Sequence, residues 1–256
     1  MRCRNIRPVS AVCLLALVAG VKASYGSEPA IRPFEDRIVR PVPGYTAACT
    51  KKSVTGSRPA ETGVEVVEVT ANGEGSRVRR LLKRDDDITV ELEALYDPAG
   101  RLVDTPSMRF NGEAVNDDED GALPDLFEKT LIGPLYTGRP VSSGDRAAVS
   151  ITREEMQALF DKITGVRFRV DDWVDDGRVH GLVNHDPFGE VIAVEWVFRT
   201  TLSSDRGMFA ISGRGMEYFD TASGLLVSAF TSIRGASDRG DIEMTRAYQC
   251  RYVVTP

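Results

Sequence analysis

The sequence is poor in the side chains from which metal centres and nucleophilic active sites are built. It has two histidines, His180 and His185, and four cysteines, of which Cys3 and Cys13 lie close to the N-terminus. Histidines five residues apart point to opposite faces of a strand, and a zinc ion needs three or four ligands. The nucleophile and phosphate-binding motifs G-x-S-x-G, H-E-x-x-H, S-x-x-K and the P-loop do not occur. We therefore expect no metal, no cofactor and no enzymatic activity.

Long apolar runs are missing too, apart from one short run near the N-terminus. The segment VSAVCLLALVAG (9–20) is shorter than the roughly 20 residues of a transmembrane helix. Arg2, Arg4 and Arg7 precede this segment. The residues that follow it, VKA (21–23), place small or apolar side chains at the positions of a signal-peptide cleavage site, with cleavage after Ala23. This order is typical of a secretory signal peptide over residues 1–23. We expect an exported protein, periplasmic or extracellular, without a membrane span.

Clustered positive charge is scarce, which argues against nucleic acid as a partner. The formal net charge is −6, and loss of residues 1–23 removes four positive charges and no negative one, which gives −10. Affinity for phosphate comes from clustered Lys and Arg. The one basic run, RVRRLLKR (77–84), is followed at once by the triplet Asp85–Asp87. We interpret this run as a solvated strand face, with an anion site as the alternative.

After loss of the signal peptide, only Cys49 and Cys250 remain. In an oxidising compartment two cysteines are expected to form one disulfide, which here would tie the first ordered segment to the last. Two separate buried thiols are the alternative.

What the sequence does contain is period-two alternation of apolar and polar residues. Residues 88–96, 192–202 and 242–254 each place their apolar side chains on one face, and short turn sequences separate such segments. The pattern predicts a mainly β (α+β) fold, with a curved antiparallel meander sheet or half-barrel and one or two short helices packed on it. Gly213 and Gly215 coincide with a shift of apolar parity, which predicts a bulge there.

The domain organisation follows from the same pattern. Residues 24–44 are proline-rich and extended, and residues 45–256 form a single β-rich domain with a helical insert at about 122–163. Within this insert, 123–131 and 152–163 are the two helix candidates. The second begins with a capping box, Thr152 and Glu155. Its apolar stripe should pack on the concave face of the sheet; it consists of Met156, Leu159, Phe160 and Ile163.

The stretch VNDDEDGALPDLFEK (115–129) has the outline of a calcium loop. Asn116, Asp118 and Asp120 alternate before a glycine, as in an EF-hand. Counted from Asn116, however, the position of the closing bidentate glutamate is Phe127. We interpret these acids as a solvated loop before a helix, and keep the three residues as weak metal candidates only.

Arg246 breaks the apolar face of the last strand and is the leading ligand-binding candidate. It lies between Met244 and Tyr248, where it either extends to the sheet edge or anchors the polar head of an apolar ligand. Trp196 and Tyr248 are candidate contacts for the same ligand. The acids in DDWVDDGR (171–178) are the nearest candidates for acid–base chemistry.

Two segments, GPLYTGRPVSSGD (133–145) and GMEYFDTASGLLVSAFTSIRG (215–235), resemble exported bacterial proteins of unknown function. Those proteins carry P-V-x-x-G-D before a β-meander and F-D-x-x-x-G-L at the end of a strand, and they are similar to the curved-sheet-plus-helix fold of the LolA lipoprotein carriers. The resemblance covers residues 133–235 and brings no catalytic residues. It implies a scaffold or a carrier of apolar ligands.

Three functions stay open at this point. The first is an exported, non-enzymatic protein that binds an apolar small molecule or an envelope protein through a curved sheet. The second is a structural or interaction module with a filled core, and the third is a carboxylate-dependent hydrolase.

Overall fold

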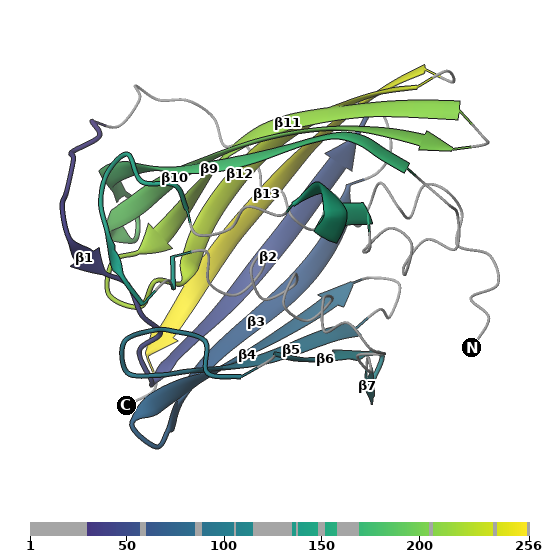
Figure 1. Ribbon diagram of the computed structural model, residues 1–256. Coiled ribbons are helices and arrows are strands. Elements are labelled where there is room, and N and C mark those ends of the chain that lie inside the picture. Colours follow the sequence, from purple (N-terminus) through teal and green to yellow (C-terminus); the bar gives the residue numbers. More distant parts are fainter. Residues whose placement is uncertain are drawn as a thin grey trace.

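The computed structural model (Figure 1) contains one large antiparallel sheet of eleven strands and a separate two-stranded pairing. The structure describes residues 30–56, 60–84, 89–104, 106–114, 135–136, 138–147, 152–157, 169–204, 207–237 and 240–254. The strands of the large sheet are β2 (Tyr45–Thr55), β3 (Glu61–Asn72), β4 (Gly75–Arg84), β5 (Thr89–Tyr96), β6 (Ser107–Phe110), β7 (Glu113–Ala114), β9 (Arg169–His185), β10 (Gly189–Ser204), β11 (Gly207–Asp220), β12 (Leu226–Ser237) and β13 (Gly240–Val254). The small pairing joins β1 (Arg37–Ile38) to β8 (Pro140–Val141).

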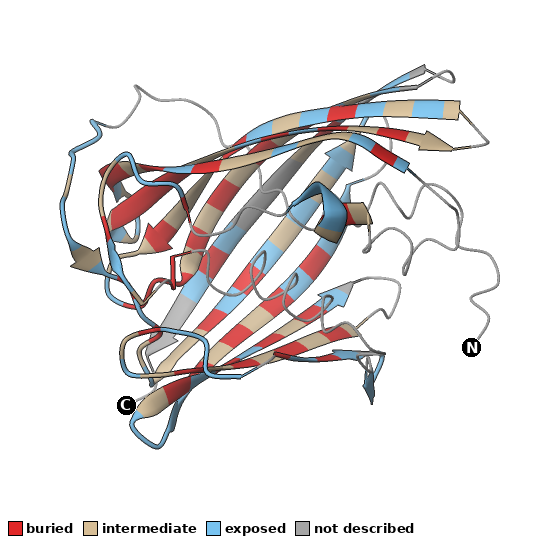
Figure 2. Cartoon of the chain, viewed as in Figure 1, coloured by how far each residue is buried: buried red, intermediate tan, exposed pale blue. Residues whose placement is uncertain are grey.

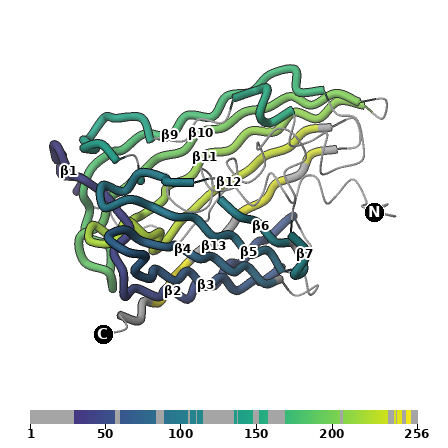
Figure 3. Tube along the Cα trace, turned by 60° about the horizontal axis from the view of Figure 1, so that its bottom comes forward, coloured from purple at the N-terminus to yellow at the C-terminus, as the bar shows by residue number. Residues whose placement is uncertain are grey.

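The sheet consists of two meanders that meet at one seam. Its strand order is β7-β6-β5-β4-β3-β2-β13-β12-β11-β10-β9, so chain neighbours pair everywhere except between β2 and β13. At that seam the first and last long strands pair antiparallel over eleven residues of each. Figures 1 and 3 show from two sides that the sheet is strongly curved. The predicted mainly β fold with a curved antiparallel meander sheet is confirmed.

Alternation along the strands separates a buried concave face from a wetter convex face. In β5 every second residue is buried, and Figure 2 shows similar banding along other long strands. In β9 and β10 buried residues also follow one another, because a second, smaller cluster of Val183, Val191, Ala193 and Val227 lies on the opposite face. Directly paired residues of antiparallel strands share a face. The core on the concave face therefore combines contributions from both meanders, among them Cys49, Val67, Val78, Leu92, Tyr96, Val179, Ile192, Val194, Phe219 and Ala229.

The bulge predicted at Gly213 and Gly215 is wrong. β11 pairs with β10 without a register shift from Gly207 to Asp220. The shifts occur instead in the pairing of β9 with β10 and near Tyr218 in the pairing of β11 with β12. A side chain at Gly213 would overlap the ring of Phe198, whose atom Cε1 would lie 2.3 Å from the added Cβ. The glycines thus make room for neighbours on the concave face and leave the strand regular.

One helical turn, residues 153–157, lies on the concave side of the sheet (Figure 1). Its capping box forms as predicted, because the Thr152 amide donates to Glu155 Oε2 at 2.7 Å and the Glu155 amide donates to Thr152 Oγ1 at 3.1 Å. Met156 is buried, which confirms its packing role, and Gln157 Oε1 accepts from the Val170 amide at 2.7 Å. The expected continuation to 163 and the helix at 123–131 lie outside the described residues.

Segments from two loops close one end of the concave face. Val39 and Val141 are buried there, and the Tyr136 ring meets the Tyr96 ring edge-on at 5.2 Å between centroids. The Tyr136 hydroxyl donates to the carbonyl of Ser223 at 2.8 Å. This end of the sheet has a solid core built from the chain's own side chains.

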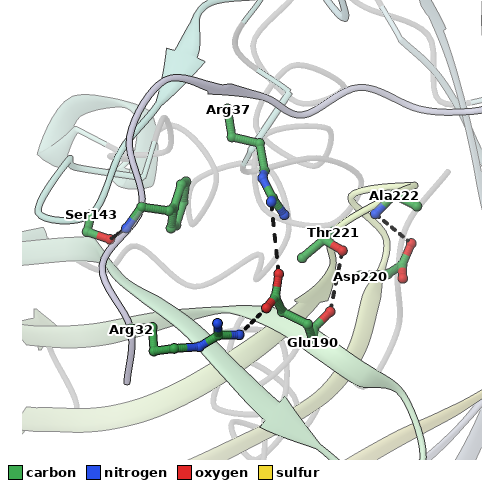
Figure 4. A network of polar contacts seen from close by, with 8 residues as sticks. Arg32, Arg37, Ser143, Glu190, Asp220, Thr221 and Ala222 are labelled. Atoms are coloured by element: carbon green, nitrogen blue, oxygen red, sulfur yellow. Dashed lines mark hydrogen bonds and ion pairs between the residues drawn. The ribbon is translucent and has the colours of Figure 1, made fainter. Parts of the chain in front are cut away.

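Residues 30–40, which we call the strap, run across the edge of β9 and over the loop that follows β8. Arg32 exchanges two backbone hydrogen bonds of 2.8 Å with Leu182, and the amide of Phe34 donates to Ser143 Oγ at 2.9 Å. Both Arg32 and Arg37 pair with Glu190 at the start of β10 (Figure 4). The proline-rich segment is extended, and over residues 30–40 these contacts fasten it to the sheet.

The disulfide between Cys49 and Cys250 is confirmed. The two residues are direct partners in the β2–β13 register, and their Cα atoms are 3.9 Å apart. The bridge spans 201 residues of sequence and crosses the seam between the meanders. Within the described residues, no helix has the length and apolar character needed to cross a bilayer.

Candidate functional site

The indole of Trp196 lies on the concave face at mid-length of β10, one strand in from the edge strand β9. Trp196 pairs in register with Gly177 on β9 and with Gly215 on β11. The benzo ring occupies the space above Gly177, where an added Cβ would lie 2.3 Å from Cζ3. At its other end Nε1 donates a hydrogen bond of 2.5 Å to Glu217 Oε2. The indole therefore lies across three strands and is held at both ends.

Glu217 is an acid whose surroundings raise its pKa strongly. It pairs with the fully buried Val194 and is itself half-buried on the concave face. Burial raises its pKa to about 8, although the Trp196 hydrogen bond and the charge of Arg80 act in the opposite direction. Asp175 raises this pKa further and Lys51 lowers it, both by smaller amounts. The carboxyl is therefore mainly protonated at neutral pH.

The influence of Arg80 on Glu217 shows how tightly the sheet curves. Their strands, β4 and β11, are five steps apart in the strand order. In a flat sheet five steps correspond to about 24 Å, too far for a substantial interaction between these charges. The curvature therefore brings the concave faces of the two meanders towards each other at this level.

Arg80 itself is part of a buried ion pair with Glu65 of β3. Both side chains are less than a tenth exposed, and Glu65 pairs in register with Cys49 of the disulfide. The sequence reading of 77–84 as a solvated face is thus wrong for Arg80. It holds for Arg77 and Arg79, which form ion pairs with glutamates of neighbouring strands on the convex face.

Two further residues complete the concave face near Trp196. Phe198 lies over Gly213, and its register partner on β9 is Asp175. Thr200 is fully buried, and its Oγ1 has no hydrogen-bond partner among the residues that the structure describes. The face thus contains an aromatic platform, two acids and a buried hydroxyl on β9, β10 and β11. A neutral carboxyl in this setting can donate a hydrogen bond or release a proton to balance a new charge.

Only part of the predicted site falls within the described residues. Trp196 lies on the concave face as its strand pattern indicates. The backbone of Arg246 pairs with Ser53 and Thr231, but its side chain and that of Tyr248 lie outside the described part. The metal candidates Asn116, Asp118 and Asp120 also lie outside it.

The acids of 171–178 divide between the two faces. Asp172 accepts from Arg199 and Asp176 accepts from Arg146 and Arg178 on the convex side, at 3.1–3.2 Å. Asp175 shares the concave face with Trp196 and acts on Glu217. The sequence prediction therefore included Asp175, which lies on the concave face, but it missed Glu217.

The histidines have separate partners. His180 Nε2 lies 2.8 Å from Glu195 Oε2, whereas the His185 ring packs 4.6 Å from that of Tyr218, between centroids. Burial lowers the pKa of His185. No group of three or more His, Cys, Asp or Glu side chains suited to a metal ion occurs in the described part of the chain.

The convex face carries a charged groove over β3 to β6. Arg79 Nε lies 2.7 Å from Glu91 Oε1, and Arg77 Nε lies 3.6 Å from Glu93 Oε1. Exposed pairs of this kind contribute about 0–1 kcal/mol each. The groove is lined by Glu68, Thr70, Arg77, Arg79, Glu91, Glu93, Ser107 and Arg109.

No family model and no curated protein matches the chain. Among solved structures, a "putative exported protein with YmcC-like fold" from Bacteroides fragilis is similar with a TM-score of 0.35 and 9% identity, over 84% of this chain and 99% of that one. A "putative lipoprotein" from Parabacteroides distasonis is similar with a TM-score of 0.29 and 11% identity, over the same shares. The chain thus has a weak structural resemblance to one protein described as exported and one described as a lipoprotein.

Proposed function

We propose that this chain is an exported, non-enzymatic binding protein that holds an amphiphilic small molecule against the concave face of its sheet. The observation that carries the proposal is the position of Glu217. A half-buried carboxyl, protonated at neutral pH and fixed by Trp196, lies between two buried apolar register partners, Val194 and Ala229. Burial of a polar group costs free energy unless its hydrogen bonds are satisfied, and a ligand's polar part supplies such a partner.

Export rests on the N-terminal sequence, in which a basic region, a short apolar segment and a cleavage region ending at Ala23 follow one another. The disulfide agrees with an oxidising compartment, because such bridges are rare in reducing ones. Both features support a periplasmic or extracellular location.

The test is binding of dodecyl maltoside, kept below its micelle concentration, to the mature protein by titration calorimetry. Trp196→Ala removes the concave platform and is expected to abolish binding. Val197→Ala is the matched control, because the neighbouring side chain lies on the convex face and is 44% exposed. Saturable binding that only Trp196→Ala removes supports the proposal. No binding of any dodecyl compound would leave the filled-core scaffold as the better description.

A carboxylate-dependent hydrolase is the second candidate. One observation favours it: the protonated Glu217 and the nearby Asp175 share a face, as a general acid and a carboxylate partner would. The measurement is turnover of a panel of chromogenic glycosides. Turnover that Glu217→Gln abolishes while binding persists would replace the binding protein with this enzyme.

A further inference from the structure

The charged groups that act on Glu217 come from different meanders according to their sign. Asp175 and Glu217 lie on β9 and β11, on either side of Trp196. The basic groups that act on Glu217, Lys51 and Arg80, come from β2 and β4 of the other meander. Arg80 is already neutralised by Glu65. Around Trp196 the face therefore combines aromatic rings with the carboxyl groups of Asp175 and Glu217.

The aromatic rings at this place lie against the strand backbones. The benzo ring of Trp196 lies over Gly177 and the ring of Phe198 lies over Gly213, with 2.3 Å to the position of an added Cβ in each case. Aromatic faces beside carboxylates are the surroundings in which proteins bind ammonium groups, through the ring quadrupole and opposite charge.

A separate polar feature of the same face is the Thr200 hydroxyl. Thr200 lies two residues from Phe198 on the same face of β10 and pairs with Trp173 of β9. Its Oγ1 is buried and has no hydrogen-bond partner within the described ranges. Thr200 lies six register positions from Glu217 along the strands, about 20 Å, so its hydroxyl is outside the reach of a head group held by that carboxyl.

We propose that the polar part of the ligand is an organic ammonium group, held by the carboxylates of Glu217 and Asp175 against the indole of Trp196. The ligand class is thus an amphiphile with a cationic head and an apolar tail. This inference rests on the proposed function, because it specifies the head of the molecule that the concave face binds.

Binding of a cation should release a proton from Glu217. The groups known to act on this carboxyl are Trp196, Arg80, Asp175 and Lys51, and its pKa is about 8 without ligand. An ammonium group beside it favours the ionised form and lowers this pKa. Affinity for the cation therefore rises with pH towards 8 and levels off above it.

The experiment compares three probes that share a dodecyl chain and differ in the head. These are dodecyltrimethylammonium, whose charge does not change with pH, dodecanoate and dodecyl maltoside, each kept below its micelle concentration. We expect dodecyltrimethylammonium to bind about tenfold more tightly than dodecyl maltoside at pH 8, with dodecanoate the weakest. Calorimetry in two buffers of different ionisation enthalpy should show proton release at pH 7.

Two variants separate the head site from general charge. Glu217→Gln keeps a hydrogen-bond acceptor for Trp196, and it should remove the preference for the cation, its pH dependence and the proton release. Glu195→Gln changes the net charge equally on the convex face, where Glu195 contacts His180, and should change none of these. Thr200→Val changes a residue of the same face six register positions from Glu217 and should leave the preference for the cation unchanged.

The outcomes are distinct for the two proposals. Binding of all three probes without a preference, or with a preference for dodecanoate, overturns the cationic head and leaves the binding function standing. Failure of all three probes to bind removes the binding function itself.

Discussion

Glu217 stores a proton that an ordinary glutamate would lose near pH 4.5. Burial raises its pKa to about 8 in the folded chain, with Trp196 as its hydrogen-bond donor. The folded state then binds more protons than the unfolded state between about pH 4.5 and pH 8. The sign follows directly, since stability must fall as pH rises through this window.

The first prediction concerns this pH dependence. Between pH 5 and pH 8 the Glu217 carboxyl should lower the free energy of unfolding by at most about 1.4 kcal/mol per pH unit. Glu217→Gln cannot ionise and should remove this component. Its free energy of unfolding should therefore fall less between pH 5 and pH 8 than that of the wild type. Urea denaturation at four pH values measures both. Parallel pH profiles for the two proteins would show that Glu217 ionises as an ordinary carboxyl.

Residue patterns could not identify this site. The apolar residues Phe209 and Ile211 lie on odd positions and Met216 and Tyr218 on even ones, so the sequence suggested that the strand changes face between them. The strand instead stays regular, and the acidic Glu217 occupies a core-facing position. Small and polar residues occur on this face of β11 because rings of the neighbouring strand β10 pack on them. Phe198 fills the space above Gly213, and Trp196 donates a hydrogen bond to Glu217.

At the scale of elements, the glycines of β9 and β11 set the position of the aromatic rings on β10. Gly177 and Gly213 lie on the concave face on either side of β10, beneath Trp196 and Phe198 respectively. Because glycine has no side chain, each ring occupies the space above it and packs directly against the backbone of the neighbouring strand.

The second prediction tests this packing with Gly177→Ala. The added methyl group would overlap the indole, which its hydrogen bond to Glu217 holds in place, so we expect a loss of about 1–3 kcal/mol of unfolding free energy. In a Trp196→Leu background the overlap is gone, and the same change should become neutral or slightly stabilising. Chemical denaturation of the four proteins of this cycle gives the coupling.

Gly213→Ala is the control, because its added methyl group overlaps Phe198 and not Trp196. Its cost should be the same in both backgrounds. If Trp196→Leu relieved both alanine substitutions equally, the effect would come from general loosening of the core.

The strands themselves were predictable because one face is buried. Period two placed Val90, Leu92, Ala94 and Tyr96 on one side, and all four are buried. The register shifts were not predictable, since they depend on how β9 and β12 fit their partners. The capping box was visible in sequence because it is a local pattern of two residues three apart.

For the whole molecule, the seam between β2 and β13 is what makes one sheet from two meanders. Every other pairing in the large sheet joins strands that follow one another along the chain. The seam joins strands about 200 residues apart, so its closure carries the largest loss of chain entropy in the fold. Cysteine counting predicted which residues meet there, although the meander order alone left the partner of β2 undetermined.

The third prediction follows from the position of Cys49 and Cys250 within this seam. The bridge closes a loop of 201 residues, for which the chain-entropy model gives about 5 kcal/mol of stabilisation as an upper value. Cys49→Ala with Cys250→Ala should lose much of this, and its denaturant slope should rise, because the unfolded chain without the bridge exposes more surface. Reduction of the wild type should shift both quantities in the same direction. A large loss with an unchanged slope would argue against a change in the unfolded chain and place the effect in the packing of the folded seam.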